Sequence, residues 1–188
     1  ITISSSITMI GNNLFDSMPN VESVTYQGTS EPVCSKSLFK KTKATYADVP
    51  IEYCLFCGAI PRTKGSCGEN CTFIFNHKEK SLEIIGDKMQ DYSSMKDVPW
   101  YSQIENIKSV SFKGITHIGN NSFSGATSLT NVDLSESKLE SIGKNAFGTM
   151  NKLNTFVYLG TTTPTCSEKI FTESSLLNKV YANSSYLG

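Results

Sequence analysis

The sequence has little charge, no cluster of basic residues and no long apolar run. Charged residues make up 18% of the 188 positions, and 17 Lys and Arg are balanced by 17 Asp and Glu. Because phosphate neutralisation requires a row of Lys and Arg, this composition argues against a nucleic-acid partner. No apolar run approaches the ~18 residues of a transmembrane helix, so we expect no membrane contact by this stretch itself.

Residues that carry enzyme chemistry are also scarce. The only arginine is Arg62, and neither His77 nor His117 stands beside a recognisable nucleophile motif. His117 occupies a repeat position that holds Met9 and Ser141 in other copies, which is typical of an exposed scaffold position. The carboxylates are scattered and no glycine-rich phosphate loop is present. We therefore predict that the chain is not an enzyme and uses no cofactor.

What the sequence does contain is a repeat with a period of 24 residues. A unit of this length cannot bury its own apolar face and must stack on its neighbours. Each unit holds a short alternating segment that predicts a strand, and apolar residues around a Phe that predict a short helix or turn on the opposite side. The predicted fold is therefore α/β: a leucine-rich-repeat solenoid with a parallel sheet on the concave face and short helices or turns on the convex face. The recurring positions are Phe123, Phe147 and Phe171; Leu129, Leu153 and Leu177; Val132, Phe156 and Val180; and Phe15 and Phe39.

A second duplication divides the chain into parts. Residues 1–58 are predicted to be the C-terminal end of a first repeat array, 59–66 a linker, 67–101 a β-rich spacer or N-terminal cap, and 102–188 a second array. Trp100, just ahead of the second array, is predicted to cover the end of its core. Because the chain starts without an initiator Met or signal peptide and ends inside the repeat pattern, we expect a piece of a longer protein. The duplication matches Tyr26, Gly28, Pro32, Cys34 and Phe39 to Tyr158, Gly160, Pro164, Cys166 and Phe171.

These motifs resemble a known family. The unit Ile-Thr-x-Ile-Gly-Asn-Asn-x-Phe…Leu-x-x-Val is similar to the repeat of BspA-like leucine-rich-repeat surface antigens, which occur in bacteria and in parasitic protists. The segment Cys67-Gly68-Glu69-Asn70-Cys71-Thr72-Phe73 resembles the cap that precedes the repeats in that family, with Cys71 as a departure. The resemblance implies an extracellular, cell-surface protein that adheres to host matrix or host cells.

The six cysteines leave three interpretations open. Cys54 and Cys57, followed by Cys67 and Cys71, approach the pattern of two zinc knuckles, although the wider spacing of the second pair weakens the match. Reduced thiols are a second possibility, and disulfides, which suit a secreted protein, are the favoured one. We therefore predict no metal site. The disulfide candidates are Cys34, Cys54, Cys57, Cys67 and Cys71, with Cys34 joined to Cys57 or Cys54, and Cys166 is the candidate for an unpaired thiol.

Three sequons, at Asn70, Asn120 and Asn183, are glycosylation candidates and fit a secreted protein. Ser, Thr and Asn together form nearly a third of the chain. Two or three such matches therefore arise by chance, and the sequons alone decide little about localisation.

The predicted function is binding of a protein or glycan ligand by the side chains that point outward from the concave sheet. Tyrosine is a residue favoured at binding hot spots, which singles out Tyr181. The alternative is a structural role, as a scaffold in a surface coat or in an intracellular complex; oxidised cysteines would favour the surface and free thiols the intracellular scaffold. The candidate ligand-binding residues are Ser111, Asp133, Val157 and Tyr181 in one column, and Asn131, Thr155 and Lys179 in the next.

Overall fold

The computed structural model describes residues 1–50, 56–171 and 179–182 of the chain. The chain forms two compact units. The N-terminal unit comprises Ile1–Lys64 with Phe75–Glu79, and the C-terminal unit comprises Gly65–Ile74 with Lys80–Gly188. Each unit is described by itself below.

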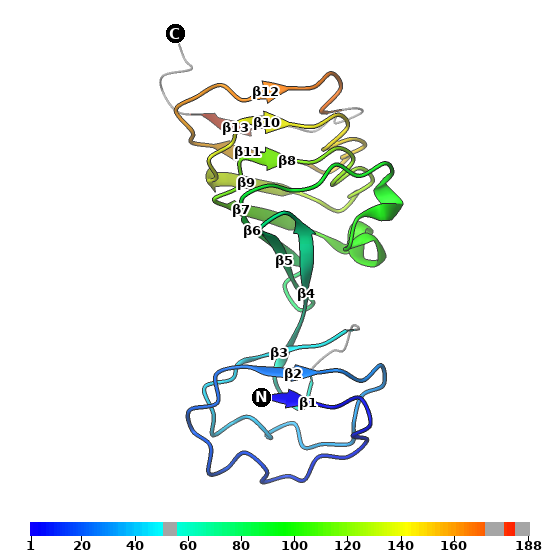
Figure 1. Ribbon diagram of the computed structural model, residues 1–188, viewed down its shortest axis with the longest axis vertical. Coiled ribbons are helices and arrows are strands. Elements are labelled where there is room, and N and C mark those ends of the chain that lie inside the picture. The colour runs from blue at the N-terminus through cyan, green and yellow to red at the C-terminus, as the bar shows by residue number, and fades with distance from the viewer. Residues whose placement is uncertain (51–55, 172–178, 183–188) are drawn as a thin grey trace. The chain divides into compact units, whose positions relative to one another are not determined.

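Short strands joined by turns make up almost all of the described chain (Figure 1). In the C-terminal unit, Figure 1 shows β6, β7, β9, β11 and β13 as one layer, and β8, β10 and β12 stacked as a second layer. The elements are β1 (Thr2–Ile3), β2 (Val24–Tyr26), β3 (Tyr46–Asp48), β4 (Ile60–Gly68), β5 (Cys71–Asn76), β6 (Ser81–Gly86), η1 (Met95–Asp97), η2 (Tyr101–Asn106), β7 (Ser109–Lys113), β8 (His117–Ile118), β9 (Asn131–Glu136), β10 (Ser141–Ile142), β11 (Thr155–Tyr158), β12 (Thr165–Cys166) and β13 (Lys179–Ala182).

The N-terminal unit is a coil whose strands β1, β2, β3 and the start of β4 pair in parallel. Its core contains a stack of aromatic rings: Phe15 lies 5.2 Å from Phe39, which lies 6.3 Å from Phe56. Phe56 is outside the 24-residue period and completely buried. It begins a tight turn in which Cys57 and Gly58 both have positive φ, and Phe56 and Ala59 exchange backbone hydrogen bonds of 2.9 and 2.8 Å. This turn therefore places Phe56 as the last ring of the stack.

In the C-terminal unit the repeat sets both the sheet register and the core. Strands β6, β7, β9, β11 and β13 pair in parallel, and alternate residues of β7, β9 and β11 are buried. Equivalent phenylalanines stack on one another, with Phe123 5.5 Å from Phe147 and Phe147 5.7 Å from Phe171. Phenylalanines 24 residues apart in sequence are thus neighbours in space, as a solenoid requires.

Trp100 begins this ring stack. Its ring lies 5.4 Å from that of Phe123 at an interplanar angle of 16°, and only 2% of the residue is exposed. Its Nε1–H donates a hydrogen bond of 3.1 Å to the Ser122 carbonyl, so the polar edge is satisfied where the rest of the ring is buried. The position agrees with the role of covering the core before the first repeat.

The segments opposite the parallel sheet are turns, which is one of the two forms that the sequence left open. The described helices are the 3₁₀ helices η1 and η2, and both belong to the stretch before the first repeat strand. The repeat corners hold residues with left-handed backbone, at Asn121 (φ 56°), Asn145 (φ 57°) and Lys169 (φ 60°). An α-helix cannot continue through a residue with positive φ, so each corner restricts the segment to turns.

The segment 59–66, expected to be a linker, instead contains most of strand β4. Pro61 and Gly65 are typical of loops, which is why the sequence pointed away from a strand. In the structure Ala47 pairs with Pro61 and Asp48 with Arg62, and the Pro61 carbonyl accepts a hydrogen bond of 3.3 Å from His77 N–H. Pairing with β3 therefore outweighs the local preference of these residues.

Candidate functional site

The outer sheet face is the side of β6, β7, β9, β11 and β13 that points away from the core of the C-terminal unit. Register pairs join Ser111 to Asp133, Asp133 to Val157, and Val157 to Tyr181, so the four residues form one unbroken column. Glu83 of β6 pairs with Ser111 and extends this column by one strand. Glu83 was missed in the sequence because β6 lies in the spacer, outside the 24-residue period.

A second column runs beside the first. Ser109 pairs with Asn131, Asn131 with Thr155, and Thr155 with Lys179. Asn131 is exposed and Thr155 is half-buried; for Lys179 only the backbone is described. Neighbouring strands lie about 4.8 Å apart, so each column presents one side chain every ~5 Å across the sheet.

The flank of the first column departs from a regular ladder. Lys113 pairs with Glu136 rather than with Ser135, because a bulge lies between β7 and β9 after the Ser111–Asp133 pair. At this point the Asp133 carboxylate Oδ1 accepts a hydrogen bond of 2.9 Å from Ser135 N–H. One oxygen of Asp133 thus holds the bulge, as Asp side chains often do for nearby backbone.

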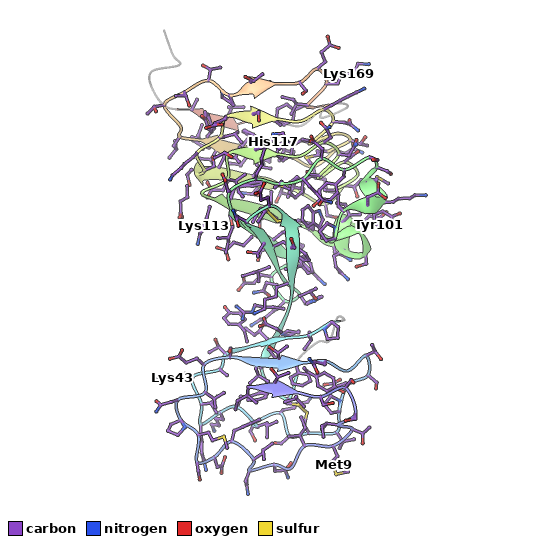
Figure 2. The ribbon with its side chains drawn as sticks, viewed as in Figure 1. Met9, Lys43, Tyr101, Lys113, His117 and Lys169 are labelled. Carbon is purple, nitrogen blue, oxygen red and sulfur yellow. A yellow bond between two sulfur atoms is a disulfide. The ribbon has the colours of Figure 1, made fainter. Side chains whose placement is uncertain are left out.

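Charge and apolar character are separated along the outer sheet face. Lys113 Nζ lies 2.7 Å from Glu83 Oε1, and the hydrogen bond and charge of Glu83, with the charge of Glu136, raise the pKa of Lys113. On the other side, Tyr181 is 50% exposed and Leu159, directly after β11, is 49% exposed. The face therefore offers an ion pair and the carboxylate of Asp133 at one side, and an aromatic and an aliphatic side chain at the other (Figure 2 labels Lys113).

The N-terminal unit carries a separate charged group on β3 and β4. Asp48 is buried, and its carboxylate lies 3.2 Å from Arg62 Nη2 and 2.6 Å from Lys64 Nζ. The Arg62 guanidinium also lies 4.5 Å above the ring of Tyr46. The sequence offered one signal for this group, the single arginine, but nothing that placed Asp48 beside it.

A chain of three polar side chains crosses the second layer of strands. His117 Nδ1 of β8 lies 2.7 Å from Ser141 Oγ of β10, and His117 Nε2 lies 3.2 Å from Asp91 Oδ1. Asp91 Oδ1 also accepts a hydrogen bond of 2.8 Å from Asn120 N–H. The expectation that His117 is exposed was wrong: 16% of its side chain is exposed, and both ring nitrogens are engaged. Sequence reasoning missed the group because Asp91 lies in the spacer.

The structure contains two disulfides. The sequence left Cys54 and Cys57 open as partners of Cys34, and the structure joins Cys34 to Cys57. The second disulfide joins Cys67 to Cys71 across the Glu69–Asn70 turn between β4 and β5. Cys166 is exposed and carries a free thiol, and Cys54 lies outside the described residues. Within the described part of the chain, no group of three or more His, Cys, Asp or Glu is placed to hold a metal ion.

The sequons differ in their surroundings. Asn70 is exposed in the turn between β4 and β5, with φ of 50°. Asn120 is half-buried, and its side-chain Oδ1 accepts a hydrogen bond of 2.6 Å from Lys144 N–H. Asn183 lies outside the described residues. Of the two described sequons, Asn70 therefore has the more accessible side chain.

In the described ranges 1–50, 56–171 and 179–182, no helix has the length and apolar character that crossing a bilayer requires.

Comparison with known proteins identifies the family of this fold. A family model for the BspA type leucine rich repeat region matches six copies, over residues 1–115 and 101–187. No curated protein matches the chain. Among solved structures, a leucine-rich repeat protein from Eubacterium ventriosum is similar, with 21% identity and a TM-score of 0.49. The match covers 66% of this chain, which spans 45% of that protein. The chain belongs to the BspA type leucine-rich-repeat family.

Proposed function

We propose that the chain is a non-enzymatic, extracellular binding module that contacts a protein or a glycan through the outer sheet face. The observation that supports this most is the column Glu83, Ser111, Asp133, Val157 and Tyr181, which register pairs align across five strands. These positions do not build the core, so their side chains are free to vary with the partner. Candidate partners are host matrix proteins and host cell-surface proteins or glycans.

The two disulfides support a location outside the reducing cytosol. Membership of the BspA type family agrees with a secreted or surface protein. The free thiol of Cys166 favours the alternative in its intracellular form, a scaffold of an intracellular complex, because an exposed thiol persists best in a reducing compartment. Alkylation of the unreduced, denatured protein from its native source separates the two: four protected thiols or more support the surface protein, and six free thiols support an intracellular scaffold.

The binding proposal is tested by a double variant, Tyr181→Ala with Asp133→Lys, against immobilised fibronectin, laminin and collagen and a glycan array. We expect wild type to bind at least one surface and the double variant to lose at least tenfold in affinity, because the variant removes the exposed ring and reverses a carboxylate. The matched control is Tyr101→Ala with Glu105→Lys, which makes the same chemical changes on η2, outside the sheet. Equal loss in both double variants, or none in either, would count against the outer sheet face.

A further inference from the structure

We propose that Ser141 is an activated serine that accepts an acyl group from an activated ester, with His117 as its general base and Asp91 as the residue that positions His117. This inference concerns the second layer of strands and does not depend on the outer sheet face. It adds a reactive side chain to a chain that the sequence predicted not to be an enzyme.

The hydrogen bonds fix the tautomer of His117. Burial raises the pKa of Asp91, but the hydrogen bonds from Asn120 N–H and His117, with the charges of His117 and Lys88, outweigh it and hold the pKa below its usual 3.8. Asp91 is therefore a carboxylate at neutral pH and can only accept hydrogen bonds. In its neutral form, the form that can act as a base, His117 then carries its proton on Nε2, 3.2 Å from Asp91 Oδ1. The lone pair of Nδ1 is left to accept the proton of Ser141 Oγ, 2.7 Å away.

This is the arrangement that nucleophilic serines require: a hydroxyl, a base within hydrogen-bond reach, and a third group that orients the base. The strand register holds it, because Ser141 pairs with His117 and the backbone of Lys88 forms a bridge to His117 on the other side. Figure 2 labels His117 in this layer. A surface pocket of about 490 Å³ lies over the group, lined also by Glu69, Lys88, Met89 and Gln90. Ser141 therefore faces a space that a small acyl donor can enter.

The nearby backbone limits the class of acyl donor. The N–H groups of Ser141 and Gly143 donate to the carbonyls of Thr116 and Ile118, at 3.2 and 2.8 Å, so neither is free to stabilise an oxyanion. The reaction is therefore confined to donors with a good leaving group, such as phenyl esters. Ser141 Oγ bonds to the ester carbonyl carbon while His117 Nδ1 takes the hydroxyl proton. The bond to the phenolate then breaks, the phenolate leaves, His117 releases the proton to solvent, and Ser141 remains as an ester.

The chain supplies its own control in Thr165. Thr165 of β12 pairs with Ser141 and carries a hydroxyl in the same row of the layer. The side chain next to Thr165 in that row is the hydroxyl of Ser141, whereas the side chain next to Ser141 on β8 is the imidazole of His117. If reactivity arose from the layer itself, Thr165 would share it; if it arises from His117 and Asp91, Ser141 alone is acylated.

The experiment is incubation of the purified chain with p-nitrophenyl acetate, followed by p-nitrophenolate release and peptide mass mapping of the acetyl group. We expect acetyl on Ser141, with a rate that falls about 10²-fold in His117→Gln, the scale of general-base catalysis. Thr165→Ala should leave the rate unchanged. In Asp91→Asn the pH profile of acylation should change shape, which a loss of fold alone would not produce. Acetyl confined to lysines, or an unchanged rate in His117→Gln, would overturn the proposal.

A second variant keeps the test decisive if His117→Gln fails to fold. In Ser141→Cys the thiol takes the place of the hydroxyl, and iodoacetamide reports its reactivity against the exposed thiol of Cys166 in the same molecule. The thiol at position 141 should react at least tenfold faster at neutral pH. Equal rates for the two thiols would show that His117 does not activate this position.

Discussion

Phe147 is the residue at which the stability of the C-terminal unit can be tested most sharply. Its side chain is fully buried, and its ring stacks between those of Phe123 and Phe171 at 5.5 and 5.7 Å. It also meets the ring of Phe156 edge-on, at 5.6 Å and 88°. Removal of the ring therefore leaves a cavity and breaks three aromatic contacts at once.

The expected cost follows from these contacts. A buried Phe→Ala substitution costs about 3–5 kcal/mol in unfolding free energy. In a solenoid each repeat packs only on its two neighbours, so no other part of the core compensates for the lost contacts. Phe147→Leu keeps most of the volume, so it should cost only about 1–2 kcal/mol, mostly through the lost ring contacts. The difference in unfolding free energy between the Ala and Leu variants measures the cost of the cavity. The cost of the Leu variant measures the contribution of the ring contacts.

Urea unfolding followed by circular dichroism measures both values, with hydrogen exchange to locate the loss in the C-terminal unit. Phe15→Ala in the N-terminal unit is the matched control, since Phe15 has one aromatic ring contact among the described residues, with Phe39. A cost for Phe147→Ala below about 1 kcal/mol would refute the argument, because that is far less than a buried ring of this size requires. Equal costs for the Ala and Leu variants would show that stacking, and not volume, carries the stability.

Three further predictions concern single backbone and side-chain positions. Lys169→Asn should stabilise the protein by about 0.5–1 kcal/mol in thermal unfolding, because Asn tolerates the φ of 60° there better than Lys; destabilisation would contradict this. Gly58→Ala should destabilise by about 2 kcal/mol or more, since φ is 92° and a Cβ would fall on the Lys36 carbonyl, whereas Gly11→Ala, with open space around it, should change little in the same urea assay. The lowered pKa of Asp91 means that its contribution is present above the ordinary pKa of 3.8 and is lost as pH falls through the folded value. Asp91→Asn should therefore flatten the loss of stability as pH falls below about 4, and an unchanged slope would refute the linkage.

Much of the C-terminal unit could be predicted because each sequence repeat forms one turn of the solenoid. The period of 24 residues aligned Phe123, Phe147 and Phe171, and the rings stack in that order. The same period aligned Asp133, Val157 and Tyr181, which the sheet register joins. In a parallel, in-register coil, residues one repeat apart in sequence lie next to each other in space. The period therefore predicts which residues are in contact.

The features that the sequence did not predict depend on residues outside the period. Asp91 reaches His117 from the spacer, and Asp48 meets Arg62 through the pairing of β3 with a strand that contains Pro61. Each is a contact between one repeat and a segment with its own geometry, and a repeat pattern contains no information about such contacts.

In the C-terminal unit, inward and outward side chains have different roles. Inward residues such as Phe147 are fixed by the turns on both sides, so a change there disturbs every neighbour. Outward residues such as Tyr181 contact solvent on one side, so a change there alters what the sheet presents but leaves the stack intact. It follows that family membership, which rests on the inward pattern, specifies the coil and leaves the partner open. If the proposed function is right, the side chains that select a partner are those of the outward columns, such as Glu83, Asp133 and Tyr181, which the sheet register aligns.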